Sequence, residues 1–393
     1  MANAFARRGM PAGKKAMALV LQGGGALGAH EWGAIVRLCE AGFYPIAVTG
    51  VSIGAVNAAA IAGAKDGDII ASLNELWRRL TLTKPPFVPD FVAETISAFG
   101  HPAMYRLRHD FYNFWSWTAF CEMAPLRETL TTVCDFDQIN DENHMGFAVT
   151  ATDVANGDSK RFLNLNSERI TPDHIIASGA LPPGFPMALV DGRSYWDGGV
   201  FDNTPMAPML ELLEACRAED VPVVVIELFP GDEEQPLPTN MLELKNRMME
   251  LTYQNRFWDD YGGLESLRSY AAMISDLAHA LPPDSPVRKN PQFNDGQFKN
   301  LLKRRFYRNL HVIKSPHVPL TGGMDFSEKS IMERYGRGRA AADSALQNGL
   351  AAATAAFARP DLRSHISIGA GRTTPISSTL DQANRRISEL TGQ

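Results

Sequence analysis

The chain has 393 residues, of which 45% are hydrophobic and 21% are charged, and its formal net charge is −6. This composition excludes collagen-like, coiled-coil and wholly disordered proteins, and the length suffices to bury a full core. The acidic balance gives no reason to expect a nucleic-acid partner. The four cysteines are widely spaced without a CxxC pair, so we expect reduced thiols in the core. They are Cys39, Cys121, Cys134 and Cys216.

The N-terminal region carries basic residues but no apolar stretch of the kind found in signal peptides. We therefore expect a cytoplasmic protein with a flexible tail over residues 1–16, and contact of that tail with the inner face of a membrane is left open. Residues 41–64 lack charge over a length that could span a bilayer. They contain Pro45, several glycines and an Ala-rich end, which favours a strand, a turn and a helix instead of a membrane span.

Two strand-turn-helix units open the chain. An apolar run over 16–22 predicts a buried parallel strand, and it leads into a glycine turn and a helix over 29–41. A strand over 47–50 and a helix over 53–64 repeat the order. Alternation of strand and helix predicts an α/β protein with a parallel sheet.

An aromatic, proline-rich segment over 81–125 follows, and we expect an insertion there. Two hypotheses fit it: a lid or acyl-binding wall that contacts lipid, or the core of a helical subdomain. The later elements predicted for the α/β unit are strands over 146–154 and 160–163, a helix over 172–179, a strand edge over 187–190, a helix over 206–216 and a core strand over 221–228 that closes the unit. An acidic linker over 230–238 leads to a mainly helical extension over 240–360, with a strand over 311–314 and a helix from Glu328. We expect a flexible tail over 370–393.

The second turn has the G-x-S-x-G spacing of a nucleophile elbow, with Ser52 between Gly50 and Gly54. A sharp turn lifts the serine hydroxyl clear of the backbone, and the flanking glycines remove side chains that would collide. The start of the following helix points free N–H groups and a positive dipole end at the site. The pattern predicts a catalytic serine.

The first turn offers the donors that a serine nucleophile needs. The N–H groups of Gly23, Gly24 and Gly25, together with that of Ile53, are candidates for an oxyanion hole.

The same turn matches the dinucleotide pattern G-x-G-x-x-G, which ends at Gly28. A dinucleotide site needs an acidic residue at the end of the second strand, and that strand runs into Thr49 and Gly50 instead. We therefore do not expect a nicotinamide or flavin cofactor.

The base that would serve Ser52 is less evident. The downstream histidines lie beyond the main α/β unit and have no supporting motif; they are His279, His311, His317 and His365. Asp197 is followed by Gly198 and Gly199, which permit close approach of its loop to the elbow. A partly desolvated carboxylate can accept the serine proton directly. Asp191 and Asp202 are the alternatives to Asp197.

Four ordered blocks within residues 17–230 resemble the patatin-like phospholipases. They are Gly23-Gly24-Gly25-x-x-Gly28, Gly50-x-Ser52-x-Gly54, the stretch 177–186, and Asp197-Gly198-Gly199 with Asn203 and Pro205. The resemblance implies a three-layer α/β/α fold with a mostly parallel central sheet. It also implies a Ser52–Asp197 dyad without histidine, and an oxyanion hole formed by residues 23–25 with Ile53. Leu27 stands where Arg or Lys is common, and the extension is similar to that of some bacterial members.

The function implied by this resemblance is hydrolysis of carboxylic ester bonds in phospholipids or other lipids through an acyl-enzyme. An esterase, thioesterase or polyhydroxyalkanoate-type hydrolase would use the same dyad, and a non-catalytic interaction protein could keep the same fold. The expected partner is an acyl-ester substrate, and homo-oligomerisation is left open. No cofactor and no metal are expected, because no metal-ligand pattern occurs in the sequence.

Overall fold

The computed structural model describes residues 10–83, 100–141, 143–165, 169–215, 221–229, 280–291, 309–316 and 323–350, with Ala218 and short pieces between 237 and 278. The expected tail over 370–393, most of the acidic linker and most of residues 240–308 lie outside the described residues. Cys216 and three aromatic residues of the segment 81–125, Phe87, Phe91 and Phe99, lie outside them as well.

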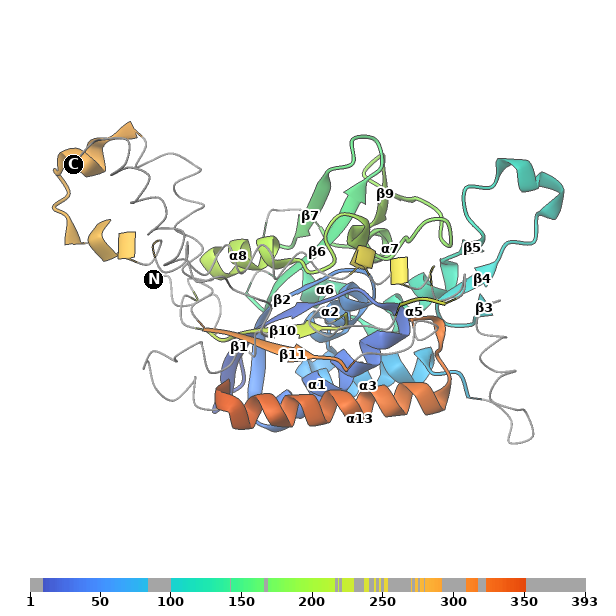
Figure 1. The fold of residues 1–393 in the computed structure, drawn as a ribbon, viewed down its shortest axis with the longest axis horizontal. Helices are drawn as coiled ribbons and strands as arrows, with labels where there is room; N and C mark the ends of the chain where they lie inside the picture. The colour runs from blue at the N-terminus through green and yellow to red at the C-terminus, as the bar shows by residue number, and fades with distance from the viewer. Residues whose placement is uncertain are drawn as a thin grey trace, which may run out of the picture.

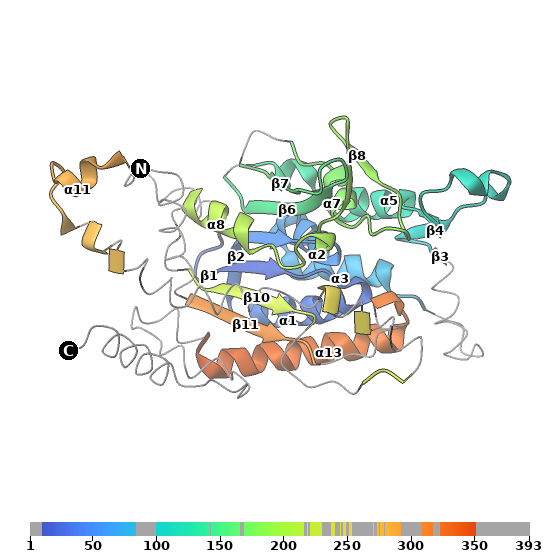
Figure 2. The ribbon, with the colours of Figure 1, turned by 45° about the horizontal axis from the view of Figure 1, so that its top comes forward.

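The centre of the protein is an eight-stranded sheet with the order β11-β10-β1-β2-β6-β9-β8, in which β7 also pairs with β6 (Figures 1 and 2). The strands are β1 (Lys15–Leu21), β2 (Phe43–Gly50), β6 (Gly146–Asp153), β7 (Ser159–Leu163), β8 (Ala188–Val190), β9 (Arg193–Asp197), β10 (Val223–Glu227) and β11 (Leu310–Lys314). All neighbours from β11 to β6 run parallel, whereas the pairs formed by β7, β8 and β9 are antiparallel. The predicted α/β fold with a mostly parallel sheet is confirmed.

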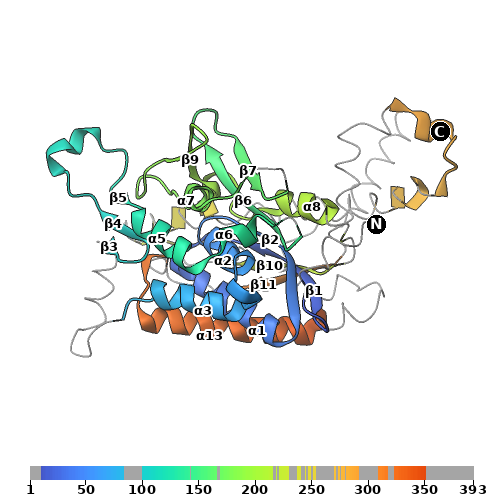
Figure 3. The same ribbon diagram turned by 180° about the vertical axis from the view of Figure 1, so that it is seen from behind.

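Helices cover both faces of this sheet (Figures 1 and 3). Met17, Leu19 and Leu21 of β1 pack on the face that carries α1, α2, α3 and α13, while Ala18 and Val20 pack with α8 on the other face. Strand residues alternate between the faces, so both faces of a central strand must be apolar to be covered. The covering helices are α1 (Gly28–Glu40), α2 (Ile53–Ala62), α3 (Ile69–Leu80), α8 (Met206–Ala215) and α13 (Glu328–Ala345). The result is the three-layer α/β/α arrangement.

Shorter elements lie around this frame. They are a small antiparallel sheet of β3 (Gly100–His101), β4 (Tyr105–Leu107) and β5 (Cys121–Glu122); the helices α5 (Ala124–Val133), α6 (Phe136–Ile139), α7 (Pro172–Ser178) and α11 (Pro286–Lys289); the 3-10 turns η1 (Gly25–Leu27), η2 (Lys65–Gly67), η3 (Phe111–Ser116) and η4 (Gly198–Val200); and the π turn η8 (Leu346–Leu350).

The sequence suggested that the strand over 221–228 closes the α/β unit, but the sheet continues beyond β10 with one more strand. β11, which lies in the expected extension, pairs in parallel with β10 from Val223↔Leu310 to Glu227↔Lys314. The helix α13 then packs along α1. A Cβ on Gly338 would collide with the carbonyl of His30, so a glycine that weakens an isolated helix is what allows the two helices to approach.

Two other sequence expectations change. The strand β9 was not anticipated, because it is only five residues long and is separated from β8 by a two-residue turn. The segment 100–125 is not a helical core: it forms the small sheet and η3, whose aromatic side chains are exposed. Cys39, Cys121 and Cys134 are buried and unpaired, as expected. Within the described ranges, no helix combines the length and the hydropathy needed to cross a bilayer.

Candidate functional site

The turn between β2 and α2 holds Ser52 in a strained backbone conformation. Ser52 stands at the N-cap of α2 with φ 54° and ψ −122°, a region that non-glycine residues rarely adopt. A Cβ on Gly50 would collide with the carbonyl of Gly54, and one on Gly54 would lie 2.5 Å from the carbonyl oxygen of Leu21. The two flanking glycines are therefore required by the close packing of the elbow.

The sheet topology brings Asp197 to this elbow. β2 pairs with β6 as far as Gly50↔Val149, and β9 pairs with β6 from Ala151↔Asp197 onwards. β7 occupies the opposite edge of β6 over this stretch, so β2 and β9 share one edge. β9 runs antiparallel and therefore ends, at Asp197, close to the point where the chain leaves β2 and turns to Ser52.

The last residue of α7 and the chain directly after it fix both residues. The carbonyl oxygen of Ser178 accepts a hydrogen bond from the Ser52 N–H at 3.0 Å, and the Ser178 hydroxyl oxygen lies 3.2 Å from the same nitrogen. The carbonyl oxygen of Ala180 accepts from the Asp197 N–H at 3.0 Å. One short segment thus sets the separation of serine and acid, a positioning role that the sequence did not reveal.

Asp197 is almost fully buried, with 2% of its surface exposed. Burial raises the pKa of its carboxyl to about 7, and hydrogen bonds from the Ser52 side chain and the Gly199 N–H oppose this rise. The Gly199 nitrogen lies 2.8 Å from Oδ1. A Cβ on Gly198 would collide with the carbonyl of Thr150, so only glycine lets this turn approach β6. The carboxylate can act as a base near neutral pH.

The alternative acids and bases have other surroundings. Asp191 is exposed in a tight turn with φ 49°, and Asp202 accepts a hydrogen bond from the Thr204 N–H at 2.9 Å. His311 lies on the edge strand β11, with its Nε2 2.8 Å from the Asn309 side-chain oxygen. His279, His317 and His365 lie outside the described residues.

The first glycine turn packs directly against the elbow. A Cβ on Gly23 would lie 3.0 Å from the Ser52 Cβ, and one on Gly28 would lie 2.7 Å from a side-chain carbon of Ile53. Gly25 has φ 58°, a left-handed conformation that suits glycine. The N–H groups of Gly23, Gly24, Gly25 and Ile53 donate to no acceptor among the described residues, so they are available to a ligand.

Asn203 and Gln22 hold the loops around the dyad together. Asn203 donates to the carbonyl oxygen of Gly23 at 3.2 Å and to that of Tyr253 at 3.3 Å. Gln22 donates to the Thr204 hydroxyl at 3.0 Å, and its side-chain oxygen accepts from the Leu228 N–H at 2.5 Å. The sequence singled out Asn203 only as part of a resemblance, and no local signal identified Gln22.

A buried polar network supports the elbow from below. Asn57 of α2 donates to the Gly28 carbonyl oxygen at 3.2 Å and to Glu31 Oε2 at 2.8 Å. It also accepts a hydrogen bond from the Trp77 indole at 2.9 Å. Burial raises the pKa of the Glu31 carboxyl well above its ordinary value, and the hydrogen bond from Asn57 opposes this rise. The network joins α1, α2 and α3 beneath the site.

Residues beyond position 240 also reach the site. The buried Arg334 of α13 donates to the carbonyl oxygens of Ala26 at 3.4 Å and Asp325 at 2.7 Å, and a Cβ on Gly25 would collide with the carbonyl of Gly323. Tyr253 has a pKa raised to about 12 by burial and by the negative charge of Asp197. The expected extension therefore borders the glycine turn as well as the sheet edge.

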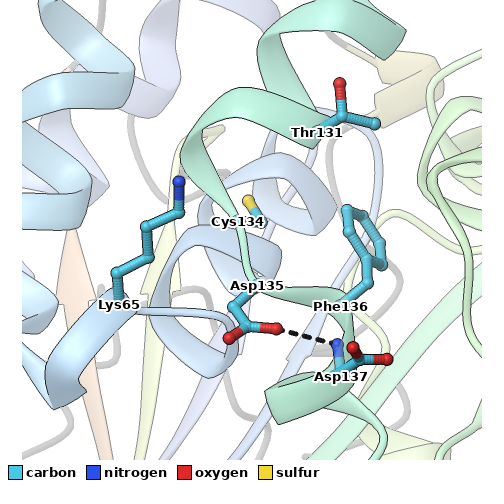
Figure 4. Close-up of a pocket in the computed structure, with 6 residues that line it drawn as sticks. All are labelled: Lys65, Thr131, Cys134, Asp135, Phe136 and Asp137. Atoms are coloured by element: carbon cyan, nitrogen blue, oxygen red, sulfur yellow. Dashed lines mark hydrogen bonds between the residues drawn. The ribbon is translucent and has the colours of Figure 1, made fainter.

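A surface hollow with a cavity volume of about 340 Å³ lies elsewhere, between the η2 turn and the α5–α6 connection (Figure 4). It is lined by Lys65, Thr131, Cys134, Asp135, Phe136 and Asp137. The hollow includes neither Ser52 nor Asp197. In the part of the chain that the structure describes, no cluster of side chains has the composition of a metal site.

The model of one protein family, described as patatin-like phospholipase, matches residues 19–210, which contain the glycine turn, the elbow and Asp197. This segment is a patatin-like phospholipase domain. The family places the domain among lipid acyl hydrolases. Among solved structures, the chain is similar to VipD from Legionella pneumophila, at 15% identity and a TM-score of 0.35, with 84% of this chain and 67% of the VipD chain covered. No curated protein matches the chain.

Proposed function

We propose that the patatin-like domain hydrolyses carboxylic ester bonds of phospholipids and related lipids, with Ser52 as nucleophile and Asp197 as general base. The observation that carries this proposal is the hydrogen bond between the Ser52 side chain and a buried carboxyl whose pKa is raised to about 7. An exposed aspartate is too weak a base to activate a hydroxyl, whereas a desolvated one near its pKa is suited to the task.

In the first half of the reaction, Ser52 Oγ attacks the ester carbonyl while Asp197 accepts the hydroxyl proton. The tetrahedral intermediate collapses to an acyl-serine, and the same proton passes from Asp197 to the departing alcohol. In the second half, water attacks the acyl-serine and gives its proton to Asp197, which returns it to Ser52 Oγ. The products are the alcohol and a fatty acid, and the enzyme is regenerated.

The N–H groups of Gly23, Gly24, Gly25 and Ile53 would bind the oxyanion. The Ser52 N–H does not serve, because it is held by the Ser178 carbonyl. Ile53 is the first residue of α2, so its N–H lies at the positive end of the helix dipole. A preorganised donor of this kind lowers the barrier by about 3 kcal/mol.

The test uses a fluorophosphonate probe and chromogenic acyl esters of graded chain length, with phosphatidylcholine and acyl thioesters as further substrates. We expect the wild type to be labelled and to hydrolyse esters, and Ser52→Ala to lose both properties. Ser344→Ala, on α13, is the matched control and should retain them. Activity that persists in Ser52→Ala would overturn the assignment of the nucleophile. A wild type that is neither labelled nor active on any substrate would favour the non-catalytic interaction protein, and a preference for thioesters would correct the substrate.

A further inference from the structure

A lobe of residues 108–120, here named the aromatic lobe, projects from the small sheet of β3, β4 and β5 (Figures 1 and 3, teal). Its largest side chains face solvent: Trp115 is 94% exposed, Tyr112 92% and Phe111 68%. Phe114 and Phe120 are also about half exposed. Contiguous apolar surface of this kind is uncommon on a protein that has no partner for it.

The aromatic lobe is an ordered structure with its own small core. The rings of Phe111 and Phe114 each lie 5.4 Å from the ring of Trp117, and the Arg108 guanidinium lies 5.1 Å from that ring. The Trp117 N–H donates to the Phe114 carbonyl oxygen at 3.1 Å. Tyr112 and Trp115 remain the most exposed side chains of the lobe.

The charges of the lobe and its root are balanced. Arg108 is paired with Asp110 at 2.5 Å, and Arg106 of β4 is paired with Glu122 of β5 at 2.9 Å. The basic groups are thus neutralised, and the surface they flank is aromatic and electrically neutral. Such a surface fits a zwitterionic lipid headgroup layer, where tyrosine and tryptophan rings find an apolar and a polar environment together. It offers little to an anionic partner.

The root of the lobe is attached to the segment that positions the acid. The Phe120 N–H donates to the Pro183 carbonyl oxygen at 3.2 Å, and the Cys121 N–H donates to that of Gly184 at 2.9 Å. This segment directly follows Ala180, whose carbonyl holds the Asp197 N–H. The lobe and the dyad are therefore connected through a few residues of one chain segment.

Further exposed apolar side chains lie on β8 and in the turn that follows Asp197. Phe201 and Val200 follow Gly199 directly and are 60% and 44% exposed, and Leu189 of β8 is 66% exposed. In Figure 2 the strand β8 lies at the top of the view, and the aromatic lobe extends to the right beyond β4.

We propose that the aromatic lobe docks the domain on a neutral phospholipid surface by inserting Tyr112 and Trp115 at the headgroup level, which delivers lipid esters to Ser52. The inference rests on the proposed function for the fate of the lipid, but the docking itself does not require catalysis.

The experiment measures co-sedimentation with phosphatidylcholine vesicles, in a Ser52→Ala background that leaves the lipid intact. We expect Tyr112→Ser/Trp115→Ser to weaken vesicle binding by more than about tenfold, because two large aromatic surfaces no longer leave water. The matched control Val287→Ser/Met332→Ser removes two apolar side chains that are 54% and 49% exposed elsewhere, and should bind as the parent does. Trp115→Phe, which keeps an aromatic ring, should retain most of the binding. Binding should change little between low and high salt, because the lobe is neutral.

When Ser52 is intact, Tyr112→Ser/Trp115→Ser should lower the ratio of the rate of vesicle hydrolysis to the rate of soluble-ester hydrolysis. Vesicle binding that survives the double lobe variant, or that requires anionic lipid and disappears in salt, would overturn the proposal. So would a lobe variant that changes the oligomeric state without changing lipid binding, since the lobe would then contact a second copy of the chain. A wild type that binds vesicles yet hydrolyses no ester would count against the proposed function alone.

Discussion

Replacing Asp197 by asparagine separates the chemical role of this residue from its structural one. Asn keeps the shape of the side chain and can still accept the Gly199 hydrogen bond, but it cannot take a proton from Ser52. We expect Asp197→Asn to lose ester hydrolysis. In the wild type, the rate should fall about tenfold for each pH unit below about 7, because the protonated carboxyl cannot serve as a base.

The same substitution should stabilise the fold at alkaline pH. The folded-state pKa of about 7 lies above the ordinary value of 3.8, so the native protein binds this proton more tightly than the unfolded chain. Stability from this group is therefore greatest below the unfolded pKa and is lost as pH rises through the interval up to about 7. Burying this group costs about 2 kcal/mol at pH 5, where it is buried protonated, and about 4 kcal/mol at pH 8, where it is buried charged.

Because Asn escapes this cost, its gain in unfolding free energy over the wild type should be about 2–3 kcal/mol larger at pH 8 than at pH 5. Urea unfolding followed by tryptophan fluorescence at both pH values measures the difference, and the exposed Asp191→Asn serves as the matched control. An equal gain at the two pH values would show that the pKa of Asp197 is not raised. Retained hydrolysis in Asp197→Asn would place the base elsewhere.

Two further predictions concern the helices beneath the site. Gly338→Ala should cost about 3 kcal/mol of unfolding free energy, because the new methyl group collides with the His30 carbonyl, whereas Gly336→Ala in the same helix has open space and should gain about 0.5 kcal/mol. Urea titration of the pair tests this, and equal effects would contradict the close approach of α13 to α1. Asn57→Leu should cost about 3 kcal/mol, because the Trp77 indole loses its acceptor in a buried site. Thermal melting measures this loss. An unchanged melting temperature in Asn57→Leu would show that the buried polar network contributes little to stability.

Local patterns in the sequence were sufficient to predict the glycine turn and the elbow that carries Ser52. The strands, turns and helices up to residue 62 follow from apolar runs and glycines that lie within a few positions of one another. The elbow around Ser52 is of this kind, since Gly50 and Gly54 contact each other and the adjacent end of β1. Its geometry is determined by neighbours in sequence, so it could be predicted without a tertiary structure.

The acid and the role of the C-terminal region required the tertiary structure. The following Gly198 and Gly199 favoured Asp197 over Asp191 and Asp202, but only the shared edge of β6 explains how Asp197 reaches the elbow. Its raised pKa results from burial by distant segments, which no local pattern encodes. The parallel pairing of β11 with β10 and the contact of Gly338 with α1 likewise join residues that are far apart in the sequence. Sequence determines which residues can make a tight turn, whereas long-range packing determines which of several identical side chains is desolvated and faces the nucleophile.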